Sequence, residues 1–238
     1  GIFNEYIEKY KRIKMTSANA KRTLAKLYLN NLYGKLASSD DSSFKYAYLK
    51  EDESIGFKTI IEHNKKTVYI PCGSAITSYA RDFTIRTAQL NYHGVNSQGF
   101  IYADTDSIHT DLPTYMIRGA EFSDTEFNKW KLESRWDEGI FIRQKTYMEH
   151  VIAEGDDYLE EPYYNIKCAG MPEKCKQLFL KSMTQDYDPN DYNEEELEFL
   201  KQEHTMDDFK RGLVIPSKLL PKRIKGGIVL VDTNYEIR

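Results

Sequence analysis

The segment GFIYADTDSIHT, residues 99–110, constrains this chain most, because it brings two carboxylates to the end of an apolar run. Residues 100–102, Phe-Ile-Tyr, predict a buried strand that leads to the two acids, and Ile108 begins a second strand that leads away from them. Asp104 and Asp106 are therefore expected at the tip of a hairpin, on the rigid support that a metal site needs.

The spacing of Asp104 and Asp106 predicts a shared site for divalent cations. Side chains of a strand alternate between its two faces, so carboxylates at i and i+2 leave on the same side, and Thr105 points away. Two anions this close repel each other, and a divalent cation is their usual neutraliser. Ligands that are all oxygen favour Mg²⁺ or Mn²⁺ over Zn²⁺. The alternative is a plain polar turn, because Asp, Thr and Ser are common turn residues.

The charge of the chain is strongly segregated, although its net value is only -4 over 238 residues. Residues 1–35 carry eight Lys/Arg against two Glu, and residues 209–238 carry seven against two acids. Residues 184–208 carry ten acids against one Lys. A polyanion responds to the local field, so the two basic ends are compatible with a phosphate-binding surface. A charged face that is simply solvated is the alternative.

The three cysteines and the absence of long apolar runs bear on the compartment. Cys72, Cys168 and Cys175 are odd in number and widely spaced, which is typical of reduced thiols in a reducing compartment. No run approaches the length of a membrane span, and residues 1–12 lack the apolar core of a signal peptide. We therefore expect an intracellular protein, with no membrane as a partner.

A helix is predicted over residues 18–37, and it carries two rows of side chains. The apolar row, at 24, 27, 28 and 32, is expected to pack on a core. A second row falls at i, i+4, i+8 and i+11, and its two cations, amide and phenol suit a triphosphate and a flat ring. An ordinary basic helix face is the alternative. The second row is Arg22, Lys26, Asn30 and Tyr33.

Further elements follow from the local patterns. Residues 40–66 predict a small hairpin insertion, and residues 73–92 a helix packed on the central sheet. Residues 114–135 predict a helix, and residues 194–204 a solvated acidic helix.

Residues 139–154 predict one strand, with Phe141, Arg143, Lys145 and Tyr147 on one face. A Lys and a Tyr on one face suit a nucleic-acid backbone, and a solvated edge strand is the alternative.

Four stretches, taken in order, resemble the C-terminal part of a protein-primed family B DNA polymerase of bacteriophages and linear plasmids. They are KLYLNNLYGKLAS at 26–38 (motif B), YADTDSIH at 102–109 (motif C), RQKTY at 143–147 (the KxY motif), and the paired thumb segments NIKCAGM at 165–171 and GGIVLVD at 226–232. The resemblance runs essentially from end to end.

The resemblance implies an α+β fold in four parts. A helical fingers segment would occupy residues 1–38, and a hairpin insertion like the second terminal-protein region residues 39–68. A palm, an antiparallel sheet backed by helices, would occupy residues 69–168, and a small, mostly β thumb residues 169–238. The family uses the insertion to encircle the template and displace the other strand.

The resemblance also implies roles for single residues. Asp104 and Asp106 would be catalytic and would hold two Mg²⁺ ions, with Mn²⁺ as the other suitable ion. The second row of the 18–37 helix would bind the incoming deoxynucleoside triphosphate, through Arg22, Lys26, Asn30 and Tyr33. Contacts to primer-template DNA would come from Lys14, Lys145, Tyr147 and Lys167.

The family also needs motif A, an aspartate on a palm strand before the fingers, and an exonuclease domain. These residues hold neither, so we expect an upstream polypeptide as a partner, together with a terminal protein that primes synthesis. If the chain is encoded by a phage, the host cytoplasm is its expected location. Two other hypotheses stay open: a non-catalytic DNA-binding subunit or half of a split polymerase, and an unrelated Mg²⁺-dependent nucleotidyl cyclase.

Overall fold

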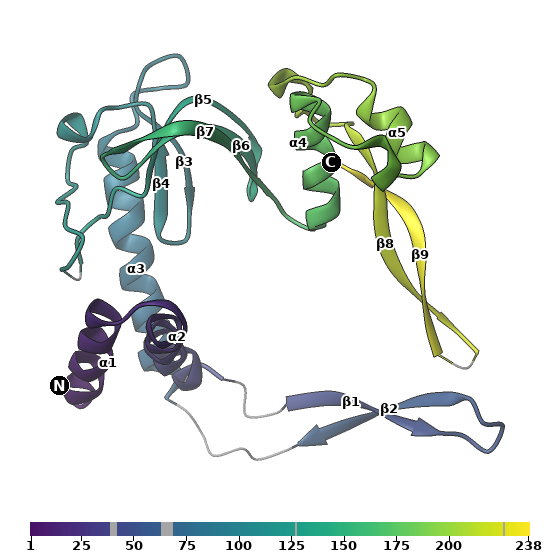
Figure 1. Cartoon of the computed structure of the whole chain (residues 1–238). Helices are drawn as coiled ribbons and strands as arrows, with labels where there is room; N and C mark the ends of the chain where they lie inside the picture. The colour runs from purple at the N-terminus through teal and green to yellow at the C-terminus, as the bar shows by residue number, and fades with distance from the viewer. Residues whose placement is uncertain (39–41, 63–68, 127, 226) are drawn as a thin grey trace. The chain divides into compact units, whose positions relative to one another are not determined.

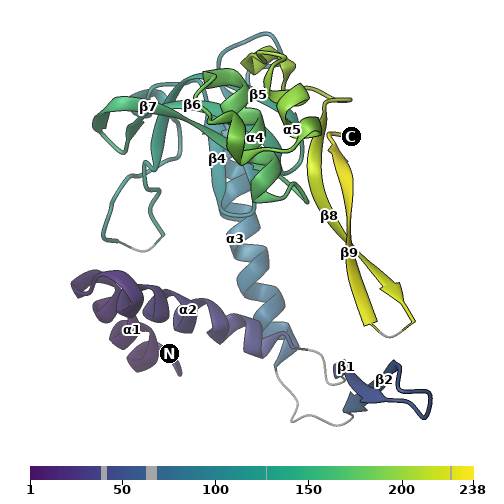
Figure 2. The same ribbon diagram turned by 45° about the vertical axis from the view of Figure 1, so that its right-hand side comes forward.

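A computed structural model of the chain describes residues 1–38, 42–62, 69–126, 128–225 and 227–238. The chain forms two compact units (Figures 1 and 2). The first comprises residues 1–50 and 55–129, and the second residues 51–54 and 130–238. Helices alternate with small antiparallel sheets, which confirms the α+β prediction. The four predicted domain boundaries remain predictions.

Helices α1 (Asn4–Thr16) and α2 (Asn19–Leu36) pack against each other largely through tyrosines. The rings of Tyr10 and Tyr28 are stacked with their centroids 4.7 Å apart, and the hydroxyl of Tyr6 donates to the carbonyl of Tyr28 at 3.0 Å. The predicted helix at 18–37 is thus confirmed.

The expectation that the apolar row of α2 packs on a core is wrong. Leu24, Leu27 and Tyr28 remain about half exposed, and Ala25 is the residue that α2 buries. The physical reason is geometric, because a neighbouring helix covers only a narrow stripe of another. Tyr28 therefore contacts α1 and Leu32 is half-buried, while Leu24 and Leu27 stay about half exposed.

The insertion forms a hairpin of β1 (Ser42–Leu49) and β2 (Ile55–Glu62), paired antiparallel, as predicted. The outer ends of the predicted insertion, at 39–41 and 63–68, lie outside the described residues.

Helix α3 (Ile70–Leu90) follows, and its first turns lie against the end of α2. Gly73 allows this approach, because a Cβ there would come within 2.7 Å of the Cβ of Ala37.

The last turns of α3 pack on the hairpin of β3 (Phe100–Asp104) and β4 (Ser107–Thr110). The carbonyl of Asn91, just past the helix, accepts from the backbone N–H of Phe100 at 2.8 Å. Gly99 has φ 154, and a side chain there would overlap that same carbonyl. Glycine at this position lets the base of the hairpin join the end of α3.

The helix predicted over 114–135 is wrong. The described part of this segment holds one 3-10 turn, Thr114–Met116, and otherwise turns and extended chain. The side chain of Asn91 explains part of this, since it accepts from the N–H of Arg118 at 2.8 Å and donates to the Arg118 carbonyl at 2.9 Å. These bonds hold the backbone out of a helix.

The second unit contains the antiparallel sheet β5-β6-β7, formed by β5 (Ser134–Arg143), β6 (Thr146–Glu154) and β7 (Asp157–Cys168). The single strand predicted over 139–154 is therefore wrong, because the chain reverses between Arg143 and Thr146. Gln144 and Lys145 form the turn, and neither belongs to the residue types that mark hairpin turns. The alternation of side chains continues across Gln144 and Lys145, so the sequence pattern does not reveal the turn.

The remainder of this unit is helical at first and ends in a long hairpin. Its elements are α4 (Glu173–Thr184), α5 (Glu194–Leu200), β8 (Val214–Ile224) and β9 (Gly227–Glu236), with 3-10 turns at Pro189–Asp191 and Met206–Asp208. Its core joins these elements to the end of the sheet through Met148, Ile166, Cys168, Met171, Cys175, Leu178, Phe179, Phe199, Leu200, Met206, Phe209, Ile215, Tyr235 and Ile237.

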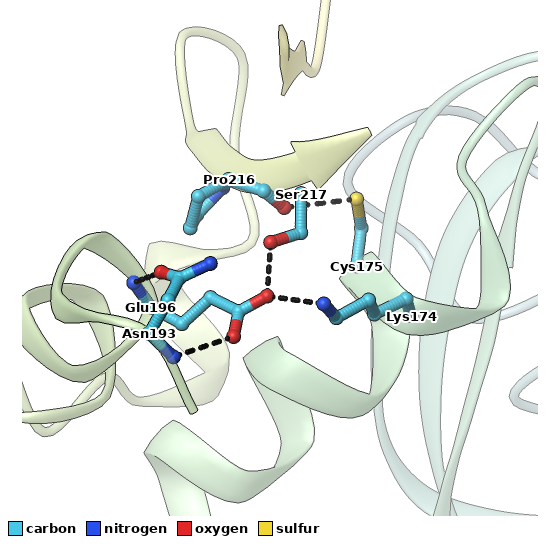
Figure 3. Close-up of polar contacts among 6 residues, drawn as sticks. All are labelled: Lys174, Cys175, Asn193, Glu196, Pro216 and Ser217. Carbon is cyan, nitrogen blue, oxygen red and sulfur yellow. Dashed lines mark hydrogen bonds and ion pairs between the residues drawn. The ribbon is translucent and has the colours of Figure 1, made fainter. Parts of the chain in front are cut away.

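The predicted solvated acidic helix is only partly solvated. Leu200 and Phe199 of α5 lie in the core, and Glu196 is 2% exposed. Figure 3 shows the Glu196 carboxylate against Lys174 of α4 and Ser217 of β8. Burial of a carboxylate is costly unless it is paired and hydrogen-bonded, as Glu196 is. The acidic composition of this segment did not indicate that one face of α5 is apolar.

Candidate functional site

The two aspartates lie at the tip of the β3–β4 hairpin, as predicted, but in different backbone positions. Asp104 is the last residue of β3 and pairs with Ser107, so Thr105 and Asp106 form a two-residue turn. The reasoning from a strand period is therefore wrong for Asp106, which lies on the turn. Asp104 is half-buried and Asp106 is exposed.

The turn itself is tight. The N–H of Asp106 donates to the carbonyl of Asp104 at 2.6 Å, and Thr105 between them has φ 52. This bond closes a γ-turn over Asp104, Thr105 and Asp106 inside the two-residue hairpin loop. A positive φ is rare for a β-branched residue such as Thr105, and it costs about 1–3 kcal/mol. Local bonds offset part of this cost, since the hydroxyls of Thr105 and Ser107 donate to the side chain and the carbonyl of Asp104, at 3.0 and 3.1 Å.

Helix α3 supports this turn through a hydrogen bond from a buried side chain. Thr84 is 5% exposed, and its hydroxyl donates to the carbonyl of Thr105 at 3.1 Å. The sequence reasoning missed this residue, because it placed the apolar side chains of α3 against the sheet. Ile76, Phe83 and Leu90 are in fact about 40–50% exposed, and the buried face of the helix consists of small and polar residues.

The donor set of the turn suits a hard divalent cation, but it is incomplete by itself. Two carboxylates supply the oxygen ligands that Mg²⁺ and Mn²⁺ prefer. Within the described ranges no group of three or more His, Cys, Asp or Glu side chains is gathered for a metal ion. Asp104 and Asp106 by themselves thus offer the oxygen donors of part of a metal site.

The predicted nucleotide-binding row lies along one side of α2. Its members are exposed, and Tyr33 retains 42% of its surface. Their spacing confines them to less than a third of the helix circumference. The row is Arg22, Lys26, Asn30 and Tyr33.

Two of the three predicted DNA-binding residues of the second unit, Tyr147 and Lys167, share one row of its sheet. Tyr147 of β6 pairs with Phe141 on one side and with Lys167 on the other. The rings of Phe141 and Tyr147 are stacked, with centroids 5.4 Å apart and planes at 20°. Lys145, with φ 57, lies in the preceding turn, where its carbonyl accepts from the N–H of Ala169 at 2.8 Å. The structure thus brings Tyr147 and Lys167 together as direct neighbours.

Lys14 lies in the last turn of α1 and is half-buried. Its contact with DNA stays a prediction. The aspartate turn and the row on α2 belong to the first compact unit, and the Tyr147 row belongs to the second.

Comparisons with known proteins agree with these motifs. The family described as DNA polymerase type B, organellar and viral, matches residues 1–115. The DNA polymerase of Bacillus phage phi29 is 35% identical over 256 residues, covering 100% of this chain and 38% of that protein. The chain belongs to the type B DNA polymerases. The polymerase of Streptococcus phage Cp-1, another relative, is 31% identical, covering 100% of the chain and 36% of its own length.

Solved structures of the phi29 polymerase share the fold. Its complex with primer-template DNA and incoming nucleotide is 34% identical, with a TM-score of 0.73, and covers 100% of this chain and 38% of that one. Its complex with single-stranded DNA gives a TM-score of 0.72. The chain therefore spans a little over a third of the length of these type B polymerases. Among the helices of the described residues, none is long and apolar enough to span a membrane.

Proposed function

We propose that this chain is the part of a type B DNA polymerase that joins an incoming deoxynucleoside triphosphate to a primer 3'-hydroxyl. The observation that carries the proposal is the β3–β4 turn, where two carboxylates lie on a strained turn fastened to α3. A plain polar turn needs neither the strain nor the buried support, and both favour a turn selected for its chemistry.

Asp104 and Asp106 would hold two Mg²⁺ ions, or Mn²⁺, together with a further carboxylate from motif A. When bound, such ions neutralise the triphosphate and favour loss of the proton of the primer hydroxyl. The chain's own contribution is to fix the two carboxylates, and positioning supplies most of the acceleration in phosphoryl transfer.

The exposed row on α2 would receive the nucleotide. Arg22 and Lys26 lie one turn apart and present two cations to the triphosphate, and Asn30 and Tyr33 continue along the same side toward the sugar and base. The order of these residues along α2 would match the order of groups in the nucleotide, from the triphosphate to the base.

Primer-template DNA would lie along the Tyr147 row. Tyr147 and Lys145 would hold the primer end, and Lys167, the partner of Tyr147 on the neighbouring strand, would add a cation. The phi29 polymerase has been solved with primer-template DNA and with nucleotide, which supports both substrates here by similarity.

The remaining partners follow from the same family. We propose that an upstream polypeptide supplies the exonuclease domain and motif A, and that a terminal protein primes synthesis inside the host cell. The β1–β2 hairpin would help to displace the strand ahead of the polymerase.

The test uses this chain assembled with the polypeptide that supplies motif A. Asp106→Ala should abolish primer extension and leave primer-template affinity within about twofold, because the change removes metal ligation and not the DNA-binding rows. Asp82→Ala is the matched control, since Asp82 is an exposed carboxylate on α3 that pairs with Arg86 at 2.8 Å. Extension by the Asp106 variant at the rate of the control would overturn the proposal. Intact DNA binding without extension by the unaltered assembly would favour the non-catalytic subunit.

A further inference from the structure

Thr84 joins two segments that are 21 residues apart in the sequence. Its hydroxyl donates to the carbonyl of Thr105, the residue between the two aspartates, at 3.1 Å. The carbonyl of Ala80, one turn earlier in α3, lies at the same distance from this hydroxyl. One hydroxyl hydrogen is thus shared between a bond within the helix and a bond to the hairpin.

The acceptor of this bond lies in the peptide unit that carries Asp106. The Thr105 carbonyl and the Asp106 N–H belong to one planar group. That N–H donates to the Asp104 carbonyl at 2.6 Å, so the two opposite edges of the peptide unit, its C=O and its N–H, are each held by a hydrogen bond. Because Thr105 has φ 52, which a β-branched residue rarely adopts, the peptide unit would relax readily if one of these bonds were lost.

Thr87 provides an internal comparison. It lies one turn further along α3, is 3% exposed, and its hydroxyl donates to the Phe83 carbonyl of its own helix at 3.1 Å. The two threonines therefore share residue type, helix and burial. They differ in the bond that Thr84 makes to the aspartate turn.

We infer that Thr84 is a positioning residue for the metal-binding turn: its hydroxyl fixes the peptide plane between Asp104 and Asp106 and so sets the direction of the Asp106 carboxylate. Thr84 touches neither nucleotide nor DNA in this role. The inference rests on the proposed function, because it assigns Thr84 to the incorporation step through Asp106. Loss of the hydroxyl should therefore slow incorporation without weakening the binding of either substrate.

The first measurement is single-turnover incorporation by the assembled polymerase. Thr84→Val, which keeps the size and removes the hydroxyl, should lower the maximal rate by about tenfold or more and change nucleotide and primer-template affinities by less than about twofold. Thr84→Ser should restore the rate to within about threefold, and Thr87→Val should stay within about threefold of the unaltered protein. Equal rates for Thr84→Val and Thr87→Val would overturn the inference.

The second measurement needs no activity. Amide hydrogen exchange in the 238-residue chain should show faster exchange of the Asp106 N–H in Thr84→Val, by about tenfold, and little change in Thr87→Val. Thr84→Ala removes the same hydroxyl without placing a methyl against the turn, and it carries the same expectations if Thr84→Val does not fold. Unchanged exchange at Asp106 in a folded Thr84 variant would contradict the inference.

The two proposals fail in different ways. If Asp106→Ala retains extension, the proposed function is wrong, whatever Thr84 does. If Asp106→Ala abolishes extension but Thr84→Val behaves as Thr87→Val, the function stands and the positioning role is wrong.

Discussion

The hydroxyl of Ser217 donates to the carboxylate of Glu196, a side chain that is 2% exposed (Figure 3). The same carboxylate is paired with the ammonium of Lys174 and accepts from the N–H of Asn193 at 3.1 Å. One buried group thus joins α4, α5 and β8. Burial raises the pKa of the Glu196 carboxyl, but the bonds from Lys174, Ser217 and Asn193 outweigh burial and hold the pKa below its ordinary value.

Glu196→Gln should lower the free energy of unfolding by about 1–3 kcal/mol at pH 7, because a charged hydrogen-bond acceptor is lost from a buried site. A carboxyl with a lowered folded pKa stabilises the protein above its unfolded pKa, about 4.3, and this contribution is lost as the pH falls through the folded pKa. The free energies of unfolding of the unaltered chain and of Glu196→Gln, measured with urea, should therefore differ most at pH 7, and the difference should shrink below about pH 4.

Glu198→Gln is the control for this experiment, because Glu198 is an exposed residue of the same helix. Its effect should stay within about 0.5 kcal/mol at each pH. A Glu196→Gln difference that persists unchanged at low pH would show that the carboxylate charge is not what stabilises the junction.

Lys26→Ala should raise the KM for the deoxynucleoside triphosphate by about tenfold or more, with a much smaller change in primer-template affinity. The reason is that Lys26 is exposed on the side of α2 that we assign to the triphosphate. Lys21→Ala is matched to it, since Lys21 is also exposed on α2 but points to another side of the helix. If gel-shift affinity for DNA fell and the KM did not move, this face of α2 would be a DNA contact.

Lys167→Ala should weaken primer-template binding about equally for all sequences and reduce the slope of affinity against salt concentration by about 1. Lys167 is exposed and faces Tyr147 across the sheet, where a phosphate contact releases one counterion. Lys201→Ala, in the acidic 184–208 region, removes an equal charge and should leave the slope unchanged. An unaltered slope in Lys167→Ala would remove this residue from the DNA surface.

The sequence predicted those parts of the site whose pattern is local. The α2 row was predictable because four side chains at helical spacing need only the helix itself to lie together. The DTD hairpin was predictable because apolar runs flank two acids. Tyr147 and Lys167 are twenty residues apart, and their pairing depends on the register of β6 and β7, which the sequence alone did not specify.

The failures share a physical cause, which is that a distant contact decided the local structure. Thr84 reads as one polar residue in a helix, and its acceptor is a backbone carbonyl 21 residues away. The segment after Thr114 is held out of a helix, in a turn at Arg118, by the side chain of Asn91. Gln144 and Lys145 turn the chain without Gly, Asn or Pro, so alternation of side chains predicted one strand where two occur.

The 238-residue chain alone should bind Mg²⁺ or Mn²⁺ weakly and extend primers poorly or not at all. Two metal ions a few ångströms apart need carboxylates from two directions, and the described residues gather only the Asp104 and Asp106 pair at the hairpin, with no group of three. The second unit should nevertheless stay folded, since it has its own apolar core. Adding a polypeptide with motif A should restore Mg²⁺-dependent extension, with Asp106→Ala chain plus the same polypeptide as the inactive control. Robust extension by the chain alone, free of contaminating polymerase and abolished by Asp106→Ala, would show that another acid of this chain completes the metal site.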